Sequence, residues 1–158
     1  MFKGIRVKDG KIKILTNIDT LGNYAFNVEN GYGPSEIVFK SALPTNIGNN
    51  VFDRITCPIY VPNRYLTDYQ LNSSLSSYSA QFTPLASMNY DSTTYTVTAL
   101  GRDNLELYVD ASLINSSVYT FVPDDSSHII TVKSVDPSLG VLDEVSQEIL
   151  VEEIDYST

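Results

Sequence analysis

The chain has 158 residues and a formal net charge of −9 at pH 7, with 42% hydrophobic and only 18% charged residues. That length suits one domain of ordinary size or two small ones, and the hydrophobic content argues against wholesale disorder. A net acidic chain is a poor binder of polyanions, so we expect no nucleic-acid partner. No apolar run reaches the roughly eighteen residues that a membrane helix needs, so we expect no membrane span.

Residues 1–16 alternate between charged and apolar side chains and are predicted to form a β-hairpin. Asp9-Gly10 lies between the two halves, and this pair tolerates the positive φ of a type I′ turn. The segment carries half of the chain's ten basic residues, which are Lys3, Arg6, Lys8, Lys11 and Lys13. One interpretation is an attachment element that contacts an acidic partner through these five side chains. The other is a cap that pairs with the next strand and places Ile12 and Ile14 on the core.

An internal repeat follows the hairpin. Residues 18–26 read IDTLGNYAF and residues 44–52 read PTNIGNNVF, so that the same Gly-Asn pair and the same final Phe recur. We expect the Gly-Asn pair to permit a tight turn in each repeat. Phe26 and Phe52 are expected to fill the core between stacked coils.

A short strand-like run follows each repeat, SEIVF at 35–39 and CPIYVP at 57–62. If the coils stack, Ile37 and Ile59 join the two phenylalanines in one core. A thermal melt of Phe52→Ala is the corresponding test, with an expected loss of roughly 3–5 kcal/mol.

The segment 59–85, IYVPNRYLTDYQLNSSLSSYSAQFTPL, has apolar residues at helical spacing in two stripes. The first stripe contains Tyr65, Leu66, Tyr69 and Leu71, and the second contains Leu75, Tyr78 and Phe82. With the preceding repeat, this pattern resembles the BspA-like leucine-rich repeats, and the resemblance covers residues 17–85. It implies a short repeat segment whose open end is closed by helices, with two repeats where the family usually has many.

The sequence pattern changes in residues 86–158, which are predicted to form an Ig-like antiparallel β-sandwich. Alternating runs occur at 92–100, 104–110, 118–122, 128–135 and 144–154, with turn residues between them. The last run also has loose helical spacing, but a final edge strand is the favoured interpretation. A single cysteine and the absence of tryptophan exclude an antibody-type core.

Few residues suggest chemistry. His128 is the only histidine and Cys57 the only cysteine, and each has a plain structural explanation, as a strand-end residue and a small core residue. A calcium site would use Asp124 and Asp125, with Asp103 or Asp110 nearby, but no loop has the alternating acidic pattern of such sites. We therefore expect no enzyme, no cofactor and no metal.

The resemblance implies a mainly β protein, a short BspA-like leucine-rich repeat with capping helices plus a C-terminal Ig-like antiparallel β-sandwich. Such modules occur in virion decoration and fibre proteins of tailed, crAss-like phages of gut bacteria. The implied function is that of a virion accessory protein, in a capsid decoration or in a head or tail fibre. The implied partners are other virion structural proteins, and a host-surface glycan or protein is a further possibility. A homo-oligomer is also possible. The alternatives are a BspA-like adhesin module on the bacterial cell surface and a small carbohydrate-binding protein.

Overall fold

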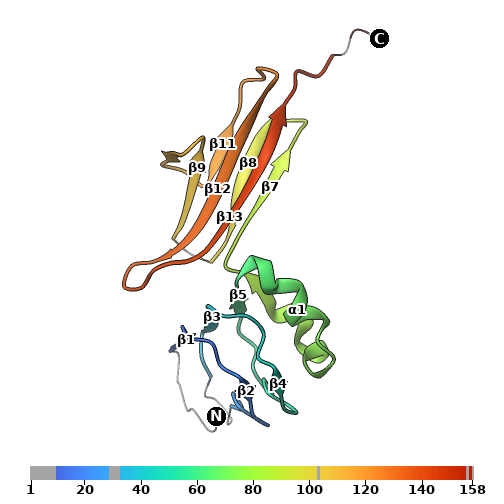
Figure 1. Cartoon of the computed structure of the whole chain (residues 1–158), viewed down its shortest axis with the longest axis vertical. Helices are drawn as coiled ribbons and strands as arrows, with labels where there is room; N and C mark the ends of the chain where they lie inside the picture. The colour runs from blue at the N-terminus through green and yellow to red at the C-terminus, as the bar shows by residue number, and fades with distance from the viewer. Residues whose placement is uncertain (1–9, 29–32, 103, 156, 158) are drawn as a thin grey trace. The chain divides into compact units, whose positions relative to one another are not determined.

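The computed structural model of the chain describes residues 10–28, 33–102, 104–155 and 157. Strands account for 45% of the structure and helices for 13%, which confirms the mainly β class. The chain divides into two compact units, Met1–Pro84 and Leu85–Thr158 (Figure 1). Among the described residues, no helix is long and apolar enough to cross a membrane.

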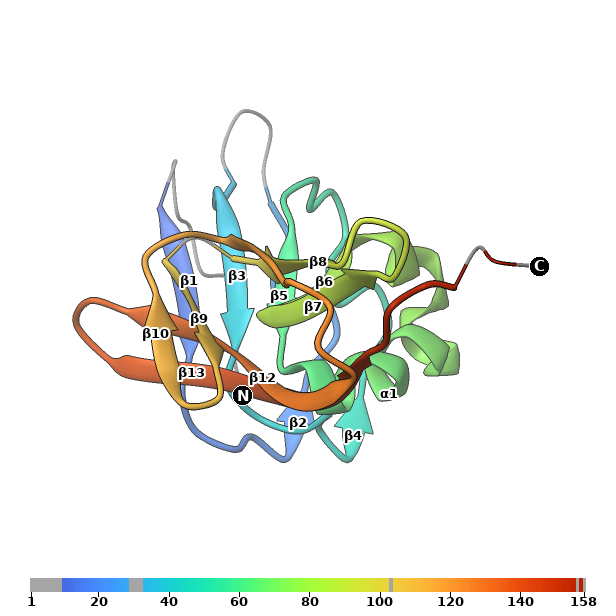
Figure 2. The same ribbon diagram turned by 90° about the horizontal axis from the view of Figure 1, so that it is seen from above.

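The first unit contains two parallel sheets. Its strands are β1 (Lys11–Ile14), β2 (Thr20–Leu21), β3 (Glu36–Phe39), β4 (Asn46–Ile47), β5 (Ile59–Val61) and β6 (Phe82–Pro84). β1, β3, β5 and β6 pair in this order, and Figure 2 shows the first three side by side. β2 and β4 form a separate pair. All four residues of β3 are buried, as expected for a central parallel strand that reads as a continuous apolar run.

The two sequence repeats adopt the same backbone conformation. Tyr24 and Asn50 occupy equivalent positions, and both have a positive φ, 56° and 52°. Each also accepts a turn hydrogen bond at 3.2 Å from the residue three positions later. The repeats lie against each other, because the Phe26 amide donates to the Val51 carbonyl at 2.9 Å. The 26-residue period of the sequence is therefore a real structural repeat of stacked coils.

The role expected for the Gly-Asn pair is wrong in detail. The left-handed residue of each turn is Tyr24 or Asn50, one position after the pair. Gly48 is needed for close approach instead, since a Cβ there would lie 2.6 Å from the backbone nitrogen of Asn23. The Asn23 side chain accepts a hydrogen bond from the Asn49 amide at 2.7 Å and so joins the coils. Sequence reasoning missed this because contacts between coils do not appear in a single repeat.

The core of the first unit contains the residues that the repeat predicts. Phe26 and Phe52 stack with ring centroids 5.3 Å apart and planes 9° from parallel. Ile37 and Ile59 are fully buried in the same cluster. Phe39 packs its edge against both rings, at 6.1 and 6.2 Å. The predicted common core is therefore confirmed.

Short helices follow β5. They are the 3-10 helix η1 (Asn63–Tyr65), the α-helix α1 (Leu66–Leu71) and the 3-10 helix η2 (Ser73–Gln81). Tyr69 is fully buried and its hydroxyl donates to the carbonyls of Ser41 and Ala42 at 3.3 and 3.2 Å. Phe82, which the sequence places in a helical stripe, instead begins β6. Its backbone pairs with Ile59, which extends the sheet by one strand.

The N-terminal hairpin lies mostly outside the described residues, including Asp9 and the whole first half. The second half is β1, which pairs in parallel with β3. Ile14 is buried, and Ile12 packs against the core. Residues 11–14 therefore belong to the sheet of the first unit. The interpretation of 1–16 as an attachment element outside the core is wrong for these four residues.

The second unit contains two antiparallel sheets. Its strands are β7 (Ala86–Asp91), β8 (Thr96–Gly101), β9 (Leu105–Val109), β10 (Ser112–Ile114), β11 (Val118–Thr120), β12 (Ser126–Asp136) and β13 (Gly140–Val151). One sheet has the order β10-β9-β12-β13 and the other β11-β8-β7. β12 and β13 form a long hairpin, clearly seen in Figure 1. The buried residues of both sheets form one cluster, centred on residues such as Val97, Leu107 and Ile130.

The favoured interpretation of 144–154 as a final edge strand is confirmed as far as Val151, where β13 ends, and the helical alternative is wrong. The remaining strand prediction for the second unit is largely confirmed, with two differences. β7 and β10 are not predicted from the sequence, because the first has few apolar residues and the second has only three residues. Residues 92–95 form a turn before β8, in which Asp91 accepts a hydrogen bond from the Thr93 amide at 2.8 Å.

Candidate functional site

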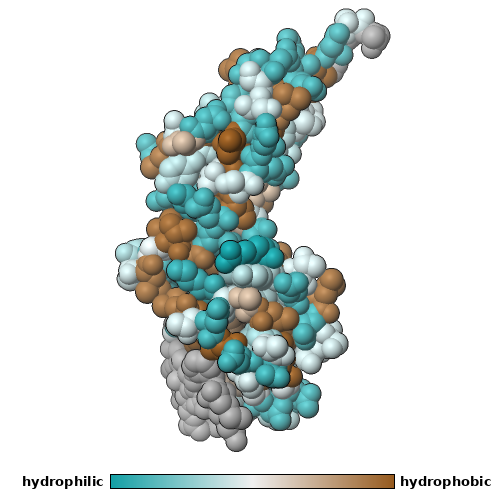
Figure 3. Space-filling model, viewed as in Figure 1, coloured by the Kyte–Doolittle hydropathy of each residue, from teal (hydrophilic) through white to brown (hydrophobic). Residues whose placement is uncertain are grey.

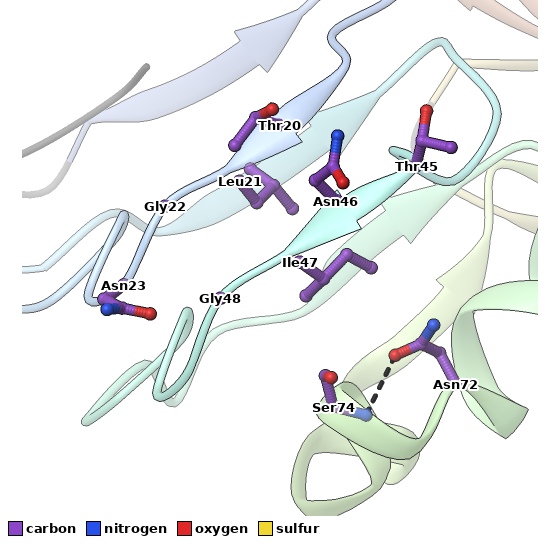
Figure 4. Close-up of a pocket in the computed structure, with 10 residues that line it drawn as sticks. All are labelled: Thr20, Leu21, Gly22, Asn23, Thr45, Asn46, Ile47, Gly48, Asn72 and Ser74. Carbon is purple, nitrogen blue, oxygen red and sulfur yellow. Dashed lines mark hydrogen bonds between the residues drawn. The ribbon is translucent and has the colours of Figure 1, made fainter.

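A groove of about 570 Å³ lies in the first unit (Figure 4). Its walls come from three consecutive passes of the chain. The first two passes are β2 and β4 with the Gly-Asn turns that follow them, and the third contains Asn72 and Ser74. The lining residues are Thr20, Leu21, Gly22, Asn23, Thr45, Asn46, Ile47, Gly48, Asn72 and Ser74.

The repeat explains why a groove exists at this place. β2 and β4 pair at equivalent positions of the two coils, with Thr20 opposite Asn46. One further period of 26 residues from Asn46 falls at Asn72. At that position the chain has left α1 and enters η2, so it offers no third strand. Figure 4 shows Asn72 and Ser74 across the groove from β4.

The groove is polar and uncharged, since none of its lining residues is ionisable. Some polar groups serve the fold: the Asn72 side chain accepts from the Ser74 amide at 2.9 Å, and the Asn46 amide group donates to the Asp19 carbonyl at 3.5 Å. The hydroxyl groups of Thr20 and Thr45 have no partner within the described part of the chain. Such a surface can exchange hydrogen bonds with a neutral ligand, but it offers no acid or base for proton transfer.

A second hollow of about 360 Å³ adjoins the groove and shares Asn72 with it. It is lined by Ala42, Leu43, Thr67, Asp68, Leu71 and Asn72. The Leu71 side chain at its wall is 78% exposed, although it belongs to the predicted apolar stripe of the cap. The groove and this hollow are both lined by residues of the coils on one side and by residues of α1, η2 or Asn72 between them on the other, and we call them together the cap groove.

The five basic residues predicted to bind a partner are only partly described. Lys3, Arg6 and Lys8 lie outside the described residues. Lys11 is half exposed and forms an ion pair at 3.4 Å with Glu36, its neighbour across the β1–β3 ladder. Lys13 lies two residues further along the same strand. Partner binding by these residues stays a prediction.

His128 is held between two carboxylates in the second unit. Its Nδ1 lies 2.7 Å from Asp110 Oδ2, and its Nε2 lies 3.2 Å from Asp124 Oδ2. The hydrogen bond to Asp110 is the main cause that raises the pKa of His128 above its usual 6.5, and Asp124 adds to it. The same bond lowers the pKa of Asp110. The ring also packs against Phe121, with centroids 4.9 Å apart.

This arrangement explains His128 as a structural link between a strand end and two turns. The calcium interpretation loses support, because Asp110 and Asp124 are turned to opposite nitrogens of the ring. Among the described residues, no group of three or more histidine, cysteine or acidic side chains could hold a metal. Sequence reasoning missed the link because Asp110 comes from a turn that lies 18 residues before His128 in the chain.

Cys57 is buried next to β5 in the first unit, and burial is the main cause that raises the pKa of its thiol. A raised pKa disfavours the thiolate that nucleophilic attack requires. Cys57 and His128 belong to different units.

On the face shown in Figure 3, hydrophobic residues are interspersed with hydrophilic ones. The cap groove offers neutral polar groups and an apolar wall in a hollow, which suits it to the recognition of a ligand. It was not predicted from the sequence, although the 26-residue period, continued once more to Asn72, would have located it. No protein-family model, curated protein or solved structure matches the chain in the comparisons with known proteins.

Proposed function

We propose that the chain is a non-catalytic structural and adhesion protein, and that it acts as an accessory protein of a phage virion, in a capsid decoration or a fibre. The observation that carries the proposal is the pairing of two module types in one short chain. A unit of stacked coils closed by helices precedes a unit of two antiparallel sheets. This pairing agrees with the BspA-like and Ig-like resemblance.

The leucine-rich-repeat part of the proposal is supported by the parallel stacking of equivalent positions. Phe26 and Phe52 stack, and β2 pairs with β4, at the 26-residue period of the sequence. Repeat arrays need a terminal cap with a polar outer face. α1 and η2 can serve this purpose, since they bury Tyr69 and Leu75 and expose mainly polar residues.

The Ig-like part is supported by the order in which strands enter the two sheets. The first, second and fifth strands of the unit, β7, β8 and β11, form one sheet. The remaining strands, β9, β10, β12 and β13, form the other. Ig-like sandwiches also exchange strands between two antiparallel sheets in this interleaved manner.

A binding role is favoured over catalysis by the chemistry of the candidate groups. The cap groove's larger hollow is lined by neutral side chains, Cys57 is buried, and both His128 nitrogens face carboxylates. The partners we propose are other virion structural proteins, with a host-surface glycan or protein as a further contact. The same modules on a bacterial surface would make the chain an adhesin.

Fractionation of a culture that produces the protein tests the setting. An antibody against the full chain should detect it in density-gradient fractions that contain capsid protein. Detection in the host envelope fraction alone would contradict the virion proposal and favour the alternative of a bacterial surface adhesin. Detection only among unassembled proteins would contradict both settings.

A second experiment tests the basic N-terminal segment on purified particles. We expect Lys3→Gln, Arg6→Gln and Lys8→Gln together to weaken association with the particle, and added salt to weaken it further, because exposed charges are screened within about 8–10 Å near physiological ionic strength. Lys40→Gln, which removes one basic charge at an exposed position elsewhere in the unit, is the control. Equal association of both variants would refute a role for the segment.

A further inference from the structure

The cap groove has features of a binding site for an extended polypeptide. β4 pairs with β2 through the amides of Asn46 and Gly48, which donate to carbonyls of the first coil at 3.0 and 2.7 Å. Alternate residues of a strand direct their backbone groups to opposite sides. The N–H and C=O of Ile47 therefore face away from β2, toward the groove. In the described part of the chain, no strand pairs with this second edge of β4.

The shape and the lining indicate what kind of ligand fits. The two hollows both border on Asn72, so a ligand longer than either hollow would contact both. Thr20 and Thr45 line the larger hollow, and their hydroxyl groups have no partner among the residues that the structure describes. The smaller hollow offers apolar contact from Leu43 and from the largely exposed Leu71. An extended peptide supplies both backbone hydrogen-bonding groups and alternating side chains, as in other cases of strand addition.

Charge indicates the side chain that such a peptide carries. Asp68 is the only charged residue among those that line the two hollows. The chain as a whole has a net charge of −9. A basic residue that lies beside Asp68 would therefore be favoured, and an acidic one would be repelled. A glycan is less well matched, since no aromatic ring lines either hollow to stack on a sugar.

We propose that the cap groove binds an extended segment of a partner protein. This segment pairs with the second edge of β4 and places an aliphatic side chain against Leu71. It is uncharged except for one basic residue, which lies beside Asp68. This inference rests on the proposed function, because it names the kind of partner that a non-catalytic binding protein would recognise. The segment acts as the third strand that the truncated repeat lacks. Its register is set by Ile47, whose N–H and C=O are the pair that an added strand can reach.

The test is a selection of displayed random twelve-residue linear peptides on the immobilised full chain, followed by affinity measurements on synthetic copies of the enriched peptides. We expect enriched sequences with alternating apolar and neutral polar residues and one Lys or Arg. Asp68→Lys and Leu71→Arg should each weaken binding by about tenfold or more. Both positions are exposed, so both variants should melt like the parent chain. Glu148→Lys and Leu113→Arg make the same changes at exposed sites of the second unit and should leave affinity unchanged.

Amide hydrogen exchange distinguishes strand addition from other modes of binding. On saturation with an enriched peptide, exchange of the Ile47 amide should slow, while the amides of Asn46 and Gly48 are already bonded to the first coil and should change little. Failure to enrich any peptide, or equal binding by the groove variants and their controls, would overturn the proposal. So would an unchanged Ile47 amide, or a neutral oligosaccharide array that binds the parent chain and fails on Leu71→Arg. None of these results affects co-sedimentation with particles, so the proposed function stands or falls separately.

Discussion

The stacked phenylalanines provide the sharpest test of the repeat. Phe52 is fully buried, and its ring contacts the rings of Phe26, Phe39, Tyr78 and Phe82 at centroid distances of 5.3, 6.2, 5.6 and 6.0 Å. Truncation of a buried Phe to Ala costs about 3–5 kcal/mol. Pairs of aromatic rings contribute stability beyond that from the burial of apolar surface. The free energy of unfolding lost in Phe52→Ala should therefore lie in the upper part of that range, about 4–5 kcal/mol.

The measurement must report on the first unit alone. The chain has 11 tyrosines and no tryptophan, so whole-protein spectroscopy would mix both units. Denaturant-dependent hydrogen exchange of peptides covering β3 and β5 gives the free energy of unfolding of this unit directly. Leu71→Ala is the matched control in the same unit, since its side chain is 78% exposed, and it should change the free energy by less than about 0.5 kcal/mol.

The result could be complete unfolding of the first unit, because a small domain has only about 5–15 kcal/mol of stability. Phe52→Leu then provides a milder step, with a smaller loss and a measurable folded state. If exchange of Phe52→Ala matched that of the parent chain or of Leu71→Ala, the stacked-coil core would be refuted.

Three further predictions concern other contacts. Gly48→Ala should destabilise the first unit by roughly 1–3 kcal/mol, because the new Cβ would meet the backbone of Asn23 at 2.6 Å; a parental denaturation midpoint would contradict this. Tyr69→Phe should cost about 1–2 kcal/mol in the same assay, since two backbone carbonyls lose their buried donor, and no change would show that water replaces it. The His128 pKa is raised in the folded state, so its contribution to the second unit's stability is complete below its usual 6.5 and is lost as pH rises through the raised pKa. NMR titration should find that Asp110→Asn lowers the His128 pKa, and an unchanged pKa would refute the Asp110 hydrogen bond as the main cause of the shift.

The repeat could be predicted from the sequence because its signal is local and occurs twice. A shared Gly-Asn pair and a shared final Phe were enough to expect stacked coils with Phe26 against Phe52. The function of Gly48 could not be predicted, since the atoms that exclude a Cβ belong to the other coil. For the strand at 11–14, the sequence left open whether it attaches to a partner or caps the repeat, because parallel pairing with β3 connects residues that are far apart in the chain.

The candidate sites also combine local features that the sequence predicts with contacts between distant residues that it does not predict. The sequence identified His128 and placed it at a strand end, which the structure confirms, but nothing local indicated that Asp110 would lie at one ring nitrogen and Asp124 at the other. The cap groove arises where a third strand is absent, and an alternation pattern predicts the strands that exist rather than a missing one. Asn72 was part of the predicted cap, and only its distance of one period from Asn46 relates it to the groove.

The different pairing of strands in the two units has a consequence for folding kinetics. In the first unit, each parallel pair such as Lys11 with Glu36 closes a loop of about one repeat period before any contact forms. In the second, β12 and β13 pair from a tight turn outward, with Asp136 opposite Gly140. Hairpins form within about 1–10 μs, whereas non-local parallel pairing is slow because loop-closure entropy is lost first. We therefore expect stopped-flow refolding to show two phases, with the second unit acquiring protected amides before the first, so that during refolding the late-forming parallel strands are the part most exposed to aggregation.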